Sequence, residues 1–238
     1  MANTRDFSGG LKQAIYWNWL RQDMWAALWE RRRCQTHFKP SKPYAHLNQY
    51  EMAARCLHLL TQAVNYHSEE ETAAGEQFPQ ARVERAEYLL SMLREWKRNL
   101  PPQFTPLASM SNMDTPFNPV WFSSSDAAQA MQMYNLARIL VLAHKPCIAG
   151  LAELQSREKE IAVAIDEICS IAVHVQDEQG MLTSLGCLRG AGIYARDAVK
   201  REALLQIVIT QQEKTRSPAT DLGAELRREW TLIDSKAS

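Results

Sequence analysis

Two residues of this sequence, Cys34 and His37, have the types and the spacing that could begin a zinc site. A thiolate and an imidazole three positions apart can supply two ligands, whereas structural zinc takes four. No second pair in the sequence completes the set, since His58, His144 and His174 each stand singly on a helical segment. We therefore expect no metal site in this chain.

The sequence also lacks the motifs of phosphate binding and nucleophilic catalysis. It contains no Gly-x-Ser-x-Gly element, no Walker loop and no His-Glu-x-x-His pair. Gly186, Gly190 and Gly192 follow no strand, so we interpret them as small residues that let two helices approach closely. With no acid/base or nucleophile pair evident, we expect neither an enzyme nor a bound cofactor.

Charge and composition limit the classes of protein that this chain can represent. Lys plus Arg (27) balances Asp plus Glu (27), and a domain that contacts DNA usually carries a clear basic excess. Five scattered cysteines argue against a disulfide framework and for a reducing, intracellular environment. Neither a signal peptide nor a transmembrane span is evident. We predict no direct DNA binding by this chain alone and no membrane association.

The segment 14–33 (AIYWNWLRQDMWAALWERRR) holds four of the seven tryptophans. At 100° per residue, Trp17, Leu20, Met24 and Leu28 form one apolar stripe, and we place Trp17 and Leu20 at the centre of the core. Trp25 and Trp29 extend this apolar surface, whereas Ile15 and Trp19 lie on the far side. Such a helix must be largely enclosed, by other helices or by a partner.

That partner is expected to be a protein or a second copy of the chain. Exposed apolar patches mark interaction sites, and tryptophan is common among interface hot spots. The competing interpretation is that the aromatic-rich segment 101–125 folds over the same surface.

Arg31, Arg32 and Arg33 follow this helix and admit two interpretations. Cations near a helix C-terminus are favoured by the negative end of its dipole. The trio could instead form a basic cluster for nuclear import.

Prolines separate the remaining helical periodicities, which predict an all-α fold of about seven helices in a single domain over 14–232. We expect a flexible segment over 1–13, a disordered tail over 233–238 and no strands. The acidic segment 67–80 and the proline-rich segment 101–125 are predicted as loops, the second packing its aromatic rings on the core. The helices are expected at 14–33, 47–67, 81–98, 126–144, 158–176, about 186–212 and about 220–232. The apolar face of 47–67 is expected to include Tyr50, Ala53, Leu57, Leu60 and Val64, and that of 81–98 to include Ala86, Leu89, Leu93 and Trp96.

Four landmarks resemble the C-terminal half of the regulatory domain of fungal zinc binuclear cluster transcription factors, the fungal-specific transcription factor domain. The first is YWNWLRQD at 16–23, and the second is the segment 96–106, which runs from Trp96 through Leu-Pro-Pro to Pro106. The third is FNPVWF at 117–122, followed by a helix and His-Lys-Pro at 134–146. The fourth is ICSIA at 168–172. The landmarks resemble those of the family in their order and spacing, and together they span roughly residues 11–232.

The resemblance implies transcription regulation in a fungal nucleus. It does not transfer zinc or DNA binding to this chain, because the family's six-cysteine cluster is not present and zinc is expected only in that N-terminal module. Ser170 replaces the glycine of the family signature, and the loop at 216–220 keeps its proline but lacks the tryptophan that often precedes it.

Two classes of function remain open. The first is a regulatory or interaction module of a zinc-cluster-type factor, which senses a small-molecule effector or a protein partner. The alternative is a helical protein-interaction module without a transcriptional role, or a truncated fragment without independent activity.

Overall fold

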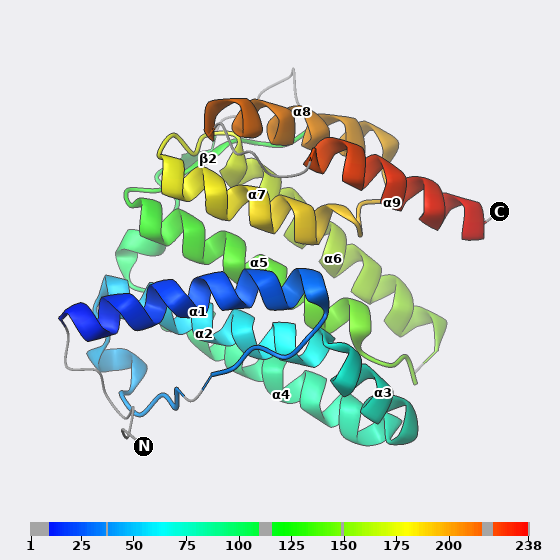
Figure 1. Ribbon diagram of the computed structural model, residues 1–238, viewed down its shortest axis with the longest axis horizontal. Coiled ribbons are helices and arrows are strands. Elements are labelled where there is room, and N and C mark those ends of the chain that lie inside the picture. The colour runs from blue at the N-terminus through cyan, green and yellow to red at the C-terminus, as the bar shows by residue number, and fades with distance from the viewer. Residues whose placement is uncertain (1–9, 37, 110–115, 149, 216–220, 238) are drawn as a thin grey trace. The chain divides into compact units, whose positions relative to one another are not determined.

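The computed structural model describes residues 10–36, 38–109, 116–148, 150–215 and 221–237. Within these residues the chain forms nine α-helices, so the predicted all-α class is confirmed, with two helices more than expected (Figure 1). They are α1 (Leu11–Glu30), α2 (Gln49–His67), α3 (Glu69–Gln77), α4 (Pro79–Arg98), α5 (Ser125–His144), α6 (Leu151–Ala172), α7 (Glu178–Gly192), α8 (Ala198–Thr215) and α9 (Leu222–Ala237).

Short elements accompany these helices in the described part of the chain. Two 3₁₀ turns are present: η1 (Tyr44–His46) precedes α2, and η2 (Pro102–Phe104) lies at the start of the proline-rich segment. Strands β1 (Ala108–Ser109) and β2 (Val120–Trp121) form a two-residue antiparallel ladder within that segment, where no strand was expected. None of the described helices combines the length and apolar composition needed to cross a membrane.

Helix caps account for the two additional helices. The segment 67–80 contains α3, because the Ser68 hydroxyl accepts a bond from the Glu71 N–H and three glutamates lie in the first turn. Acidic side chains there are favoured by the positive end of the helix dipole. The predicted run 186–212 is divided into α7 and α8, whose starts are capped by Asp177 and Asp197.

The helical region is longer than expected at both ends. Helix α1 begins at Leu11 and α9 continues to Ala237, so 11–13 and 233–237 are helical instead of flexible or disordered. The chain divides into two compact units. The first unit comprises Met1–Pro102 with Ala137–Arg157, and the second comprises Gln103–Leu136 with Glu158–Ser238. Helices α5 and α6 contribute residues to both units.

In the first unit, α1 packs against α2 and α2 packs against α4 (Figure 1). The predicted buried face of α4 is confirmed, since Leu89, Leu93 and Trp96 are buried and the Trp96 indole N–H donates to the Met52 carbonyl at 3.0 Å. Tyr50, in contrast, was expected on the buried face of α2 but is 64% exposed, because it stands in the helix's first turn.

In the second unit, α7, α8 and α9 pack together. A Cβ at Gly192 would lie 3.0 Å from a Leu226 methyl carbon, in agreement with the predicted close helix approach. The Trp230 indole N–H donates to the Gly192 carbonyl at 2.9 Å. Phe104 and Phe117 are buried, so these two rings of the proline-rich segment pack as predicted; residues 110–115 lie outside the described residues.

Candidate functional site

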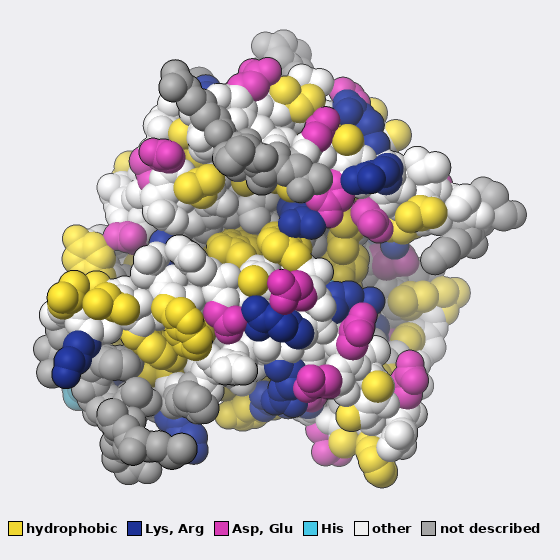
Figure 2. Space-filling view, viewed as in Figure 1, with side chains coloured by type: hydrophobic (Ala, Val, Ile, Leu, Met, Phe, Trp, Pro, Cys, Tyr) yellow, Lys and Arg dark blue, Asp and Glu magenta, His cyan; other side chains and the backbone are white. Residues whose placement is uncertain are grey.

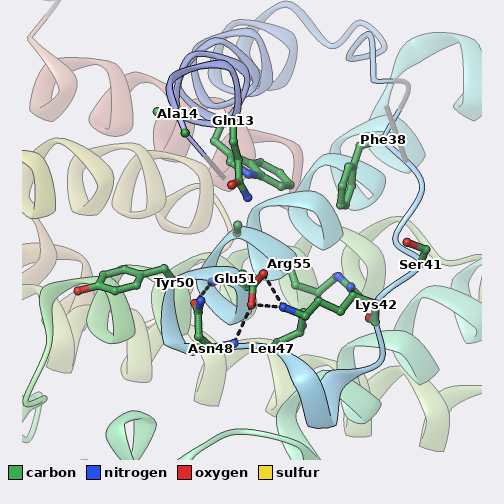
Figure 3. Close-up of a pocket in the computed structure, with 13 residues that line it drawn as sticks. Gln13, Ala14, Phe38, Ser41, Lys42, Leu47, Asn48, Tyr50, Glu51 and Arg55 are labelled. Carbon is green, nitrogen blue, oxygen red and sulfur yellow. Dashed lines mark hydrogen bonds and ion pairs between the residues drawn. The ribbon is translucent and has the colours of Figure 1, made fainter. Parts of the chain in front are cut away.

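A cavity of about 830 Å³ lies in the first unit, beside the first half of α1 (Figure 3). We call it the α1 cavity. Figure 3 shows Gln13 and Ala14 on α1 at one side, Asn48, Glu51 and Arg55 on α2 opposite, and Phe38 and Lys42 from the connecting segment between them. Cavities that bind small molecules commonly have this volume and a mostly apolar wall with a few polar groups.

The start of α2 forms the polar edge of the α1 cavity. Asn48 and Glu51 cap this helix reciprocally, since each side chain accepts the other's backbone N–H at 2.9 Å. The Lys42 ammonium lies 2.7 Å from a Glu51 carboxylate oxygen (Figure 3). Burial alone would raise the pKa of Glu51, but the bonds from Lys42 and Asn48 outweigh it and lower that pKa. Glu51 is therefore held as a carboxylate and is a poor proton donor.

Aromatic rings form the opposite, apolar edge. The Trp17 ring meets Phe38 edge to face at 4.9 Å between centroids, and Phe38 meets His58 in the same way at 5.3 Å. Tyr16 lies 5.3 Å from Trp17 and shares a hydrogen bond with Thr36 at 3.1 Å. These contacts join the connecting segment to both helices.

The Trp17 indole N–H is buried and has no hydrogen-bond partner among the described residues. An unpaired buried donor costs free energy that a suitable acceptor would recover. The lining of the α1 cavity combines the apolar surface of Ala14, Trp17 and Phe38 with the carboxylate of Glu51, which is already paired with Lys42.

The tryptophans singled out in the sequence occupy different environments. Leu20 is fully buried as expected, whereas Trp17 is only half-buried and lines the α1 cavity, so its expected place at the core centre is wrong. Trp25 and Trp29 stack with their rings 5.9 Å apart and are half-buried. Trp19 is 47% exposed.

An exposed apolar stripe runs along the N-terminal half of α1. Leu11, Ile15 and Trp19, spaced four residues apart, are 76%, 58% and 47% exposed. We call these three residues the α1 stripe. Figure 2 shows hydrophobic side chains gathered over this half of α1, with charged side chains over its second half.

The three arginines after α1 differ in their contacts. Arg31 caps the helix with a left-handed backbone, and its carbonyl accepts the Glu69 N–H at 2.8 Å. Arg32 pairs with Asp23 and Glu30 at 2.8 and 2.6 Å. Arg33 pairs with Glu71 at 3.4 Å. These contacts favour a role at the helix end, and nuclear import stays a prediction.

Cys34 anchors the connecting segment to α1. Its thiol donates to the Asp23 carboxylate at 3.1 Å, and burial raises the pKa of this thiol far above its usual value. His37, the other half of the pair, lies outside the described residues. No group of three or more His, Cys, Asp or Glu side chains in the described part of the chain could hold a metal ion.

Lys42 and Phe38 belong to no motif that is recognisable in the sequence. The Asn48-to-Glu51 spacing is a capping-box signature that could have located the polar edge. No local signal points to Phe38, since its ring contacts with Trp17 and His58 lie 20 or more positions away in the chain.

Comparison of the chain with models of known protein families, with curated protein sequences and with solved structures gives no match.

Proposed function

We propose that this chain is a regulatory module of a fungal zinc-cluster-type transcription factor and binds a protein partner through the α1 stripe. The transcriptional part of the proposal is supported by the four sequence landmarks and by an all-α fold. Several landmark residues (Trp96, Phe117, Ile168 and Cys169) are buried, as residues that define a domain's packing should be.

The observation that carries the proposal is the exposure of Leu11, Ile15 and Trp19 along one edge of α1. Three large apolar side chains at four-residue spacing form the surface that an amphipathic helix or a hydrophobic groove of a partner would cover. Tryptophan at the end of such a stripe supplies a large contact area at little cost in conformational entropy.

The α1 cavity provides a route for effector control of this surface. Ala14 and Trp17 line the cavity, and Ile15 and Trp19 lie on the same two turns of α1. A small molecule bound in the cavity would therefore change the position or stability of the turns that carry the stripe. In this proposal the effector and the partner are coupled through one helix.

A tethered reporter assay tests the proposal. The chain, fused to an unrelated DNA-binding domain in a fungal host, should change expression of a reporter several-fold relative to that domain alone. Replacing both Ile15 and Trp19 with Gln should abolish the change. Replacing Phe78, which is 66% exposed between α3 and α4 and does not line the α1 cavity, with Gln serves as the matched control and should leave the effect intact.

Unchanged reporter expression by the wild-type fusion, at verified protein levels, would contradict the transcriptional role. An effect that survives the Ile15→Gln, Trp19→Gln pair would contradict the assignment of the stripe.

A further inference from the structure

A second cavity of the first unit, about 950 Å³ in volume, is lined by α2 and α4, which pack together, and by the segment before α2. We call it the α2–α4 groove. Arg55, His58 and Gln62 recur at helical spacing on one face of α2, and Arg85, Tyr88 and Glu95 do so on one face of α4. Lys39 and Tyr44 line the groove from the connecting segment.

Its lining contains three cations and one carboxylate. Lys39, Arg55 and Arg85 supply the positive charges, and Glu95 is the single acidic side chain of the described lining. Among the described residues, none of the three cations forms an ion pair with a carboxylate. Elsewhere in the first unit, cations such as Arg32, Lys42 and Lys145 do have carboxylate partners.

Both guanidinium groups are held in place by neutral partners. Arg55 donates from Nη2 to the Lys42 carbonyl at 2.9 Å and lies 5.1 Å from the centroid of the Tyr44 ring. Arg85 donates from Nη2 to the Gln62 amide oxygen at 3.3 Å and lies 5.6 Å from the centroid of the Tyr88 ring. Since a guanidinium carries five N–H donors, each arginine keeps donors for an anion.

The floor of the groove is apolar but contains an unsatisfied polar atom. Leu59 and His58 are buried there, and His58 Nδ1 has no hydrogen-bond partner within the described structure. Burial and the nearby Arg55 lower the pKa of His58 to about 4, so the imidazole is neutral at pH 7. The neutral ring packs edge to face against Phe38 with 5.3 Å between the centroids, so His58 adds no positive charge to the groove.

We infer that the α2–α4 groove binds a small organic anion with a flat, largely apolar body. The anionic group would pair with the guanidinium groups of Arg55 and Arg85, while the body would pack on Leu59 and the tyrosine rings. Fixed guanidinium groups with open donors are suited to carboxylates and other planar or branched anions. Arg55 and Phe38 also line the α1 cavity, whereas Arg85 lines only the groove. Anion binding in the groove does not require the α1 stripe or a transcriptional role.

Two probes test whether the ligand must carry a negative charge: 2-naphthoate and its neutral isostere 2-naphthamide. Each is titrated into the full chain in a calorimeter. The naphthoate should bind at least about tenfold more tightly than the amide, and this preference should shrink with added salt. Arg55→Gln and Arg85→Gln should each weaken naphthoate binding about fivefold or more, with little effect on the amide.

Two further variants keep the result interpretable. Arg94→Gln removes an exposed α4 cation outside the groove lining and should leave naphthoate affinity unchanged. Glu95→Gln removes the single carboxylate and should tighten naphthoate binding, a gain that an unfolded variant cannot produce. Circular dichroism should report the same helix content for all variants.

Equal affinities for the acid and the amide would overturn the inference, as would no binding of naphthoate at millimolar concentration. An Arg94→Gln loss as large as that of Arg85→Gln would also overturn it, because the effect would then reflect net charge alone.

Discussion

The Nδ1 atom of His67, at the end of α2, lies 3.0 Å from the Nε2 atom of His144, at the end of α5. The His144 Nδ1–H donates to the Leu140 carbonyl at 2.9 Å, which leaves Nε2 as the acceptor of a neutral ring. His67 therefore carries its proton on Nδ1 and donates it to His144. His144 must be neutral for this arrangement to persist, since a proton on its Nε2 atom would place two donors face to face.

This histidine pair predicts loss of stability on acidification. Burial, followed by the neighbouring His144 and two arginines, lowers the pKa of His67 to about 3, and burial also lowers the pKa of His144. The unfolded chain binds protons near pH 6.5 while the folded chain does not, so stability is complete above that pH and falls toward pH 3. Each such histidine contributes a slope of up to about 1.4 kcal/mol per pH unit.

Urea unfolding at pH 4, 5, 6 and 7 measures this slope. His67→Gln should reduce the pH dependence, and His46→Gln, at an exposed position before α2, is the matched control that should not. A free energy of unfolding that stays constant between pH 4 and 6.5 would contradict the assignment.

A second prediction contrasts two positions of α1. Leu20→Ala removes a fully buried side chain and should cost about 2 to 5 kcal/mol by leaving a cavity. Trp17→Phe should have a much smaller effect, because it keeps an aromatic ring beside Phe38 and removes an indole N–H that lacks a partner among the described residues. Denaturant unfolding of both variants provides the comparison, and equal losses would show that Trp17 is a core residue.

The third prediction concerns DNA. The chain carries no net charge and no six-cysteine cluster, so it should not bind duplex DNA specifically. In gel-shift titrations at 50 and 200 mM salt, any weak association should disappear at the higher concentration and should not distinguish sequences. A sequence-dependent shift that survives 200 mM salt would refute this.

The fourth prediction concerns self-association through the α1 stripe. Light scattering on the chain at increasing concentration should detect a reversible dimer, and Ile15→Gln with Trp19→Gln should restore the monomer. Phe78→Gln, which removes a similarly exposed ring between α3 and α4, should leave the dimer unchanged. A monomer over the whole concentration range would exclude a second copy as the partner.

Periodicity in the sequence was sufficient to predict much of the fold. The all-α class and the buried faces that carry Leu89, Trp96 and Leu226 follow from apolar residues recurring at helical spacing. Helix α3 was missed because its sequence has no apolar face; a cap and first-turn glutamates define its start. Such capping residues are local in the sequence, so the start of α3 is recognisable from Ser68 and the glutamates that follow it.

The candidate sites were less predictable, because they depend on how helices are placed side by side. Arg55 and Arg85 belong to different helices whose relative register a single sequence does not specify, and His67 and His144 are 77 positions apart. The distribution of apolar residues on α1 explains why the position of Trp17 was predicted wrongly. Its apolar residues occur all around the helix, so periodicity placed Trp17 in the core, whereas a loop residue, Phe38, determines its environment.

The division of α5 and α6 between two units has a consequence for synthesis on the ribosome. The first unit needs Ala137–Arg157 in addition to Met1–Pro102, and residues 103–136 of the second unit are made in between. At about 5 to 20 residues per second, translation of the intervening segments takes on the order of several seconds. Until then α1, α2 and α4 have apolar faces without their full set of neighbours, so the nascent chain should engage chaperones during this interval.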